Sequence, residues 1–190
     1  MLRKETVENF IKKLASVEPA PGGGSAAALA GSLAAALALM AINIASPKVN
    51  SRKTKDCLRK AKKKLNSLKK SLILLVDKDA EAYGKVAGAF KLPKNTEAEM
   101  EKRREKIQEC YKIAAIIPLK SAVLSFQAKG IIRNIKNLIP GNLVSDIEVA
   151  EYLAEAALKG AVANVRINLP GIKNKKFKEK ANLALRRITK

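Results

Sequence analysis

The stretch PAPGGGSAAALAGSLAAALALMA, residues 19–41, constrains the fold more than any other part of the chain. Three consecutive glycines precede a run, Ser25 to Ile44, that contains no charged residue and consists mostly of Ala, Leu and Gly. Such a run predicts a buried helix at the centre of a helical core, with Ser25 as its N-cap. A membrane-spanning helix is the alternative, because the length suits a bilayer. The weak apolarity of Ala, with two Ser and one Asn in the run, favours the core helix.

The rest of the chain repeats apolar residues at helical spacing and shows no convincing strand. Pro118 is expected to kink or end a helix, and Ser145 is expected to cap one. Aromatic residues are only 4% of the chain, so the core must consist of small aliphatic side chains. We therefore predict one all-α domain over residues 1–190, a bundle of long antiparallel helices. The predicted helices cover 7–14, 25–44, 51–90, 97–117 and 119–138, followed by helices beginning near 145 and 174.

The glycine run does not have the features of a phosphate-binding loop. GGGS lacks the Lys-Ser/Thr pair and the preceding strand that such a loop needs. The free N–H groups at a helix start still favour an anionic or carbonyl group. Gly23, Gly24 and Ser25 are therefore candidate binding residues.

Asp79 interrupts the apolar seam of the long 51–90 helix. The seam repeats every seventh residue, as Leu65, Leu72, Asp79 and Val86. Asp77 and Glu81 are expected on the polar side of the helix. A buried carboxylate must find an ion-pair partner, raise its pKa or face a polar cavity. Asp79 is therefore either half of a structural ion pair or a site carboxylate.

Two further polar groups interrupt the helical pattern. Asn142 and Asp146 lie in PGNLVSD, which predicts either turn and cap chemistry or the wall of a polar pocket. Asn164 and Asn168 lie four residues apart on a stripe of small residues. They predict either buried amides that complete a helix contact or ligand-binding groups.

The titratable residues limit the available chemistry. The chain has no His, and Cys57 and Cys110 are its only cysteines. This excludes His-based catalysis and predicts neither a metal site nor a disulfide framework. Proton transfer would fall to carboxylates, Lys, Tyr or water. The charged N-terminus lacks the apolar segment of a signal peptide, and a cytoplasmic location is expected.

The formal net charge of +21 predicts attraction to polyanions. Nucleic acid, acidic lipid and a poly-carboxylate ligand are candidates, and a Lys-rich solvated surface explains the charge equally well. The chain has no nucleic-acid-binding motif and few aromatic residues for base stacking, so nucleic acid is the weaker interpretation.

Five blocks of the sequence, in order, resemble the formiminotetrahydrofolate cyclodeaminase family, which includes stand-alone methenyltetrahydrofolate cyclohydrolases. The blocks are PAPGGGS (19–25), LVDKDAEAY (75–83), LPKNTEAE (92–99), GNLVSD (141–146) and NVRINL (164–169). Lys48 takes a basic position typical of the family, and Pro47 stands where members tend to have Gly.

The resemblance implies an intertwined all-helical homodimer with the folate in a groove between subunits, and no cofactor beyond the tetrahydrofolate substrate. It implies that N10 of 5-formiminotetrahydrofolate attacks the formimino carbon and that ammonia leaves, giving 5,10-methenyltetrahydrofolate. The alternatives are a cyclohydrolase or, from a different class, a basic helical nucleic-acid-binding protein. A polyglutamate tail on the folate would suit the positive charge. The implied catalytic residues are Asp79 and Asp146, and the implied substrate-binding residues are Gly23, Gly24, Ser25, Lys48, Asn142, Asn164 and Asn168.

Overall fold

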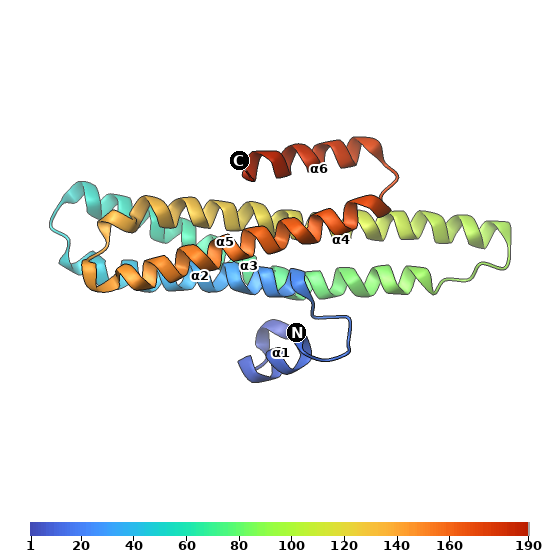
Figure 1. The fold of residues 1–190 in the computed structure, drawn as a ribbon, viewed down its shortest axis with the longest axis horizontal. Helices are drawn as coiled ribbons and strands as arrows, with labels where there is room; N and C mark the ends of the chain where they lie inside the picture. Colours follow the sequence, from blue (N-terminus) through green and yellow to red (C-terminus); the bar gives the residue numbers. More distant parts are fainter. Residues whose placement is uncertain (190) are drawn as a thin grey trace.

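The computed structural model describes residues 1–189, which contain six α-helices and no strand. Four long helices, α2 to α5, run side by side, and the shorter α1 and α6 lie on opposite sides of them (Figure 1). The predicted all-α architecture is confirmed. The helices are α1 (Val7–Leu14), α2 (Gly23–Ala45), α3 (Arg52–Phe90), α4 (Glu97–Ile135), α5 (Val144–Asn168) and α6 (Lys175–Ile188).

The central helix of the bundle is α2, which packs against α3, α4 and α5. Ala34, Ala35, Ala38 and Ala41 have no exposed surface. By length and composition two helical segments, 23–48 and 97–138, are apolar enough to span a membrane, but 61% of the apolar window in the first is buried inside the bundle. The structure therefore confirms the predicted core helix.

The N-terminus of α2 differs from the prediction. Gly22 occupies the N-cap position and the helix begins at Gly23, two residues before the predicted cap Ser25. The Ser25 side chain is fully buried and donates instead to the Val76 carbonyl of α3, at 2.9 Å. The hydroxyl therefore joins two helices rather than capping one.

The antiparallel contact between α2 and α3 repeats every seventh residue. Gly24 of α2 faces Asp79 of α3, and Gly31 faces Leu72 one heptad further along. A Cβ on Gly24 would overlap the Asp79 carboxyl group, and a Cβ on Gly31 would come within 2.8 Å of Ser125 Oγ on α4 and 3.2 Å of Leu72. The missing side chains therefore let the helices approach closely. Asp79 therefore lies on the same seam as Leu72, as predicted.

Pro118 does not end the helix that contains it, because α4 continues from Glu97 to Ile135. Proline has no N–H, so in a helix it leaves the carbonyl four residues earlier without its usual donor. That carbonyl belongs to Ala114, and Nδ2 of Asn168 donates to it at 3.1 Å. An amide from α5 therefore replaces the missing hydrogen bond of α4.

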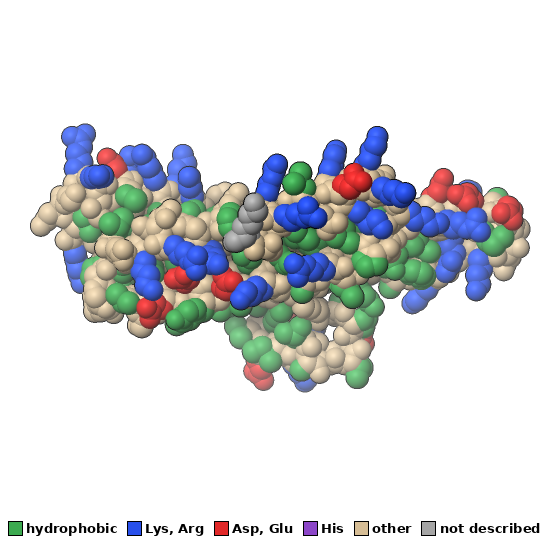
Figure 2. Space-filling model, turned by 45° about the horizontal axis from the view of Figure 1, so that its top comes forward, with side chains coloured by type: hydrophobic (Ala, Val, Ile, Leu, Met, Phe, Trp, Pro, Cys, Tyr) green, Lys and Arg blue, Asp and Glu red, His purple; other side chains and the backbone are tan. Residues whose placement is uncertain are grey.

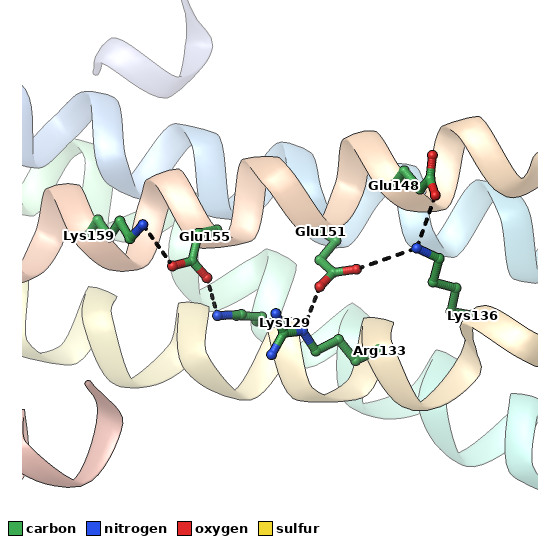
Figure 3. Close-up of polar contacts among 7 residues, drawn as sticks. All are labelled: Lys129, Arg133, Lys136, Glu148, Glu151, Glu155 and Lys159. Carbon is green, nitrogen blue, oxygen red and sulfur yellow. Dashed lines mark hydrogen bonds and ion pairs between the residues drawn. The ribbon is translucent and has the colours of Figure 1, made fainter. Parts of the chain in front are cut away.

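Helix α5 also begins differently from the prediction. Ser145 does not cap it, because the helix begins at Val144, directly after the 3-10 turn Gly141–Leu143. Three acidic residues of α5 lie toward α4. They form ion pairs with basic residues of α4 in an antiparallel register (Figure 3). The pairs are Lys129–Glu155, Arg133–Glu151 and Lys136–Glu148, with Lys159 also bound to Glu155.

The expectation that Asp77 lies on the polar side of α3 is wrong. Its side chain is buried, and its Oδ2 lies 3.4 Å from the Arg3 guanidinium. The backbone N–H of Arg3 also donates to Asp77 Oδ1, at 3.3 Å. The N-terminal turn Leu2–Lys4 packs over this part of α3 and covers the carboxylate. Glu81 is exposed, as predicted.

Candidate functional site

A cavity of about 540 Å³ opens where the N-terminus of α2 meets α3, α4 and the C-terminal part of α5. It brings together Gly23, Gly24, Asp79, Asn164 and Asn168, which are predicted site residues from three distant segments. Its other walls are apolar or aromatic. They comprise Pro19, Ala20, Gly22, Ala80, Ala82, Tyr83, Val86, Ala87, Phe90, Tyr111, Ala114 and Ile167.

Asp79 is the carboxylate of this cavity. Burial raises its pKa above 3.8, and hydrogen bonding from the Ser25 side chain and backbone opposes part of that shift. Within residues 1–189 Asp79 has no ion-pair partner, so the structural ion pair is not observed. A carboxyl group whose pKa is raised keeps its proton to higher pH, which suits it to a role as a general acid.

Two glycines of α2 shape the floor of the cavity. A Cβ on Gly23 would come within 3.2 Å of Asn164 Nδ2, and a Cβ on Gly24 would overlap the Asp79 carboxyl group. The N-cap Gly22 supplies no side-chain hydrogen bond to the first turn. The first turn of α2 therefore presents backbone rather than side chains to the cavity, beside the carboxyl group.

The amides of Asn164 and Asn168 are held by hydrogen bonds to backbone. Asn164 Nδ2 donates to the Gly160 carbonyl at 2.9 Å. Asn168 Nδ2 donates to the carbonyls of Asn164 and Ala114, at 2.8 and 3.1 Å. With the amide nitrogens engaged, the two Oδ1 atoms are the groups available to accept hydrogen bonds from a ligand.

An aromatic wall adds residues that the analysis of the sequence did not identify. Phe90 and Tyr111 make an edge-to-face contact with ring centroids 6.1 Å apart. Tyr83 lies one helical turn after Asp79 on α3 and lines the same cavity. Tyr83 and Phe90 lie four and eleven residues after Asp79, on the same face of one helix, so this spacing could have indicated them. Tyr111 comes from α4 and has no such signal. Flat rings of this kind suit a planar ligand.

Lys48, Asn142 and Asp146 lie at the other end of the bundle. Asp146 is in the first turn of α5 and Asn168 is its last residue, so about 30 Å of helix separates them at 1.5 Å per residue. Lys48 is exposed directly after α2, and Asn142 is exposed before α5. Within one chain, the predicted site residues therefore form two separate groups, one in the cavity and one at the far end of the bundle.

The positive charge lies outside the cavity. Among the described residues, no Lys or Arg lines it. Figure 2 shows Lys and Arg side chains distributed along the exterior of the bundle, with few acidic residues between them. The field of the molecule attracts anions, but a carboxylate inside this cavity meets no cation from residues 1–189.

The cavity therefore combines a largely buried carboxyl group beside a glycine-rich helix start with two hydrogen-bonded amides and an aromatic wall, which are features of a small-molecule site. This chain belongs to the formiminotransferase-cyclodeaminase family, because the model of that family matches residues 6–187. The resemblance drawn from the five sequence blocks is thereby confirmed.

Three relatives illustrate the membership. A methenyltetrahydrofolate cyclohydrolase of Methylorubrum extorquens is 35% identical over 179 residues, which cover 94% of this chain and 86% of that protein. The formimidoyltransferase-cyclodeaminase of Rattus norvegicus is 35% identical over 173 residues, 90% of this chain and 32% of that protein. The crystal structure of formiminotetrahydrofolate cyclodeaminase from Thermotoga maritima matches with a TM-score of 0.87 and 25% identity, over 99% of this chain and 90% of that one. This chain therefore spans about a third of the rat protein but most of the two bacterial ones.

Proposed function

We propose that this protein is a folate one-carbon enzyme that closes 5-formiminotetrahydrofolate to 5,10-methenyltetrahydrofolate with release of ammonia. The observation that carries the proposal is Asp79, a carboxyl group in the cavity wall whose burial favours its neutral form. Family membership and the likeness to a cyclodeaminase structure support the substrate class.

The reaction needs one proton removed from N10 and one delivered to the departing nitrogen. Attack of N10 on the formimino carbon forms the new C–N bond and a tetrahedral carbon that carries an amino group. Neutral Asp79 donates its proton to that amino group, and the resulting carboxylate accepts the proton of N10. With the N10 lone pair free, the C–N bond to the protonated amino group breaks, ammonia leaves, and Asp79 ends the cycle as it began. Asp146 is the second proposed proton-transfer residue.

The cavity supports recognition of the folate ring. The Oδ1 atoms of Asn164 and Asn168 can accept hydrogen bonds from the N–H groups of the pteridine. Tyr83, Phe90 and Tyr111 offer aromatic surface against its plane. Backbone N–H groups at the start of α2 favour polar or anionic ligand atoms beside Gly23 and Gly24.

The site as proposed requires a second copy of the chain. The predicted residues at the far end, Lys48, Asn142 and Asp146, cannot reach the cavity of their own chain. In an antiparallel homodimer the cavity end of one copy lies beside the far end of the other. The partner would then supply the cation that the cavity lacks, and each dimer would contain two composite sites.

An apolar face suits this assembly. Helices α2 and α5 pack against each other, and each exposes large apolar side chains. Exposed apolar side chains that gather into a patch are typical of protein interfaces. The exposed residues are Leu33, Met40 and Ile44 on α2, and Val149, Tyr152 and Ile167 on α5.

The excess positive charge supports a polyglutamylated substrate. A folate tail with several carboxylates would leave the neutral cavity and follow the basic exterior, where it would gain Coulomb attraction. The basic surface alone does not favour nucleic acid, because a polyglutamate tail explains the same positive charge.

The second candidate activity is methenyltetrahydrofolate cyclohydrolase. It is favoured by one observation: the Methylorubrum extorquens relative, of which this chain covers 86%, has that name. Water would then attack the methenyl carbon between N5 and N10, and the same carboxyl group would move the protons. Both reactions share the one-carbon bridge, so one cavity suits either.

An assay of the purified protein on both folates separates the two activities. The methenyl compound absorbs in the near ultraviolet, so its appearance from 5-formiminotetrahydrofolate reports cyclodeaminase and its accelerated loss reports cyclohydrolase. Asp79→Asn is the matched control for each substrate. If the wild type converts neither folate faster than the uncatalysed reaction, the proposed function is wrong. Equal catalysed rates for the wild type and the variant would instead exclude Asp79 as the proton-transfer residue.

A further inference from the structure

Ser25 contacts two acceptors with a hydroxyl group that has one proton. Its Oγ lies 2.9 Å from the Val76 carbonyl oxygen and 3.1 Å from Oδ2 of Asp79. A carbonyl oxygen only accepts, so the hydroxyl proton must point at Val76 for the first contact to be a hydrogen bond. The second contact then requires a proton on Asp79 Oδ2. When the hydroxyl proton turns to Oδ2 instead, that oxygen is free of a proton.

A second serine shows which part of this arrangement is structural. Ser32 lies two helical turns further along α2, is also buried, and donates to the Lys69 carbonyl of α3 at 3.3 Å. Both serines therefore join α2 to α3 in the same way, seven residues apart on each helix. Only Ser25 has a carboxylate as an additional neighbour, so its contact with Asp79 goes beyond helix packing.

No charged side chain among the described residues of the cavity wall pairs with Asp79, so its polar side-chain partner is Ser25. The titratable side chains that line the cavity with Asp79 are the phenols of Tyr83 on α3 and Tyr111 on α4. Among the described residues, α2 and α5 add no charged group to this wall. Of the charged neighbours on α3, Asp77 is paired with Arg3, and Lys78 lines a different groove against α4 and α6.

We propose that Ser25 is a positioning residue that turns its hydroxyl proton between the Val76 carbonyl and Asp79 Oδ2. While the hydroxyl donates to Oδ2, the proton of neutral Asp79 must reside on Oδ1, and Oδ1 is then the oxygen that exchanges a proton with the substrate. Oδ1 is the carboxylate atom nearest to the Cβ position of Gly24, at the cavity wall. While Asp79 gives up its proton, the turned hydroxyl donates to Oδ2 and stabilises the negative charge that develops. The kinetic consequence rests on the proposed function, whereas the hydrogen-bond switch does not.

Ser25→Ala tests the inference, with Ser32→Ala as the matched control. Both substitutions remove a buried hydroxyl that joins α2 to α3, so a purely structural role predicts the same small effect from each. The inference predicts that Ser25→Ala alone lowers kcat about tenfold, the loss expected for one hydrogen bond to a charged group, with KM nearly unchanged. Its kcat should also persist to higher pH, because ionised Asp79 has lost a donor. Ser25→Cys, with a weaker donor, should lie between wild type and Ala.

A direct titration of Asp79 makes the inference independent of any assay. The side-chain carboxyl carbon of Asp79 can be followed by NMR across pH, and its signal is assigned by its absence in Asp79→Asn. The midpoint should rise in Ser25→Ala and stay at the wild-type value in Ser32→Ala. An unchanged or lowered midpoint in Ser25→Ala overturns the inference even if the enzyme acts on folate. Failure of both folate assays would instead contradict the proposed function and leave this titration as the test.

Discussion

The α-carbon of Gly24 lies against the carboxyl group of Asp79, so closely that a Cβ there would come within 3.0 Å of Cγ and both oxygens. The two most unusual features of the sequence, a glycine run and an acidic residue on an apolar seam, are therefore one structural feature. The glycine makes room for the carboxyl group between two packed helices. The packing also removes water from the carboxyl group, which raises its pKa.

Gly24→Ala should displace Asp79. Because the new methyl would overlap the Asp79 carboxyl group, which is held by its hydrogen bond with Ser25, we expect a loss of stability of about 1–3 kcal/mol and a large loss of activity. Gly84→Ala on α3 is the matched control, since a Cβ there meets nothing within 4 Å. In that exposed helical position alanine should be neutral or stabilising by up to about 1 kcal/mol. Thermal unfolding and turnover of both variants measure the contrast, and equal behaviour of the two would count against this account.

Asp79→Asn should reduce turnover by about 10², or roughly 3 kcal/mol at the transition state, while the fold is kept. The amide has nearly the same shape and can still contact Ser25, but it cannot exchange a proton. Turnover per folded molecule on the active substrate measures the effect. A variant with near-normal turnover would exclude Asp79 as the proton-transfer residue.

The same variant should gain relative stability as the pH rises. The pKa of Asp79 is higher in the folded protein than the 3.8 of an unperturbed carboxyl, so between these two values the folded state binds more protons than the unfolded state. The free energy of unfolding of the wild type therefore falls through this window as pH increases, and then levels off. The free energy of unfolding of Asp79→Asn has no such decrease, because the amide does not titrate. Urea unfolding of both proteins at several pH values should show the stability of the variant rising relative to that of the wild type toward neutral pH. A difference in stability that does not change with pH would contradict the raised pKa.

Features of the fold and the site that depend on residues close in the sequence could be predicted from it, and features that depend on distant residues could not. The seven-residue spacing placed Asp79 on the seam of Leu72, and the predicted start of a helix at 97 is correct because Thr96 and Glu99 form a local capping box there. That the helix continues through Pro118 could not be predicted, because the donor that compensates for the proline, Asn168, is 50 residues further along the chain. The burial of Asp77 could not be predicted, because the turn that covers it lies at the N-terminus, with Arg3 74 residues earlier. The aromatic wall required the packing of α3 against α4, which no single helix pattern contains.

Mixed dimers should test the composite site. Asp79→Asn and Asp146→Asn are each expected to be inactive as homodimers. If one site takes Asp79 from one chain and Asp146 from its partner, random mixing should restore about a quarter of the sites, because half of the dimers are mixed and each has one intact site. Subunits can be exchanged under mild denaturant and turnover compared with the unmixed variants. A monomer in light scattering at micromolar concentration, or no restored turnover in verified mixed dimers, would contradict the composite site.

Longer polyglutamate tails should bind more tightly, and added salt should reduce that advantage. The tail is expected to lie on the basic exterior, where charge attraction is screened over about 10 Å at 0.1 M salt. Binding of folates with one and with several glutamates, measured by calorimetry at low and high salt, gives the comparison. Tight binding of duplex DNA with a steep salt dependence, and no folate binding, would favour the nucleic-acid interpretation instead.

Asn168 should matter for stability through Pro118. Its amide nitrogen donates to the Ala114 carbonyl, the one that a proline at position 118 leaves without a helix donor. Asn168→Asp replaces that donor with an acceptor, so we expect a loss of about 1–3 kcal/mol in the free energy of unfolding. Pro118→Ala supplies an N–H within the helix and should reduce the cost of Asn168→Asp. Denaturant unfolding of the two single variants and the double variant measures this coupling. If the two effects simply add, Asn168 does not compensate for the proline, and its place in the cavity wall would reflect ligand binding alone.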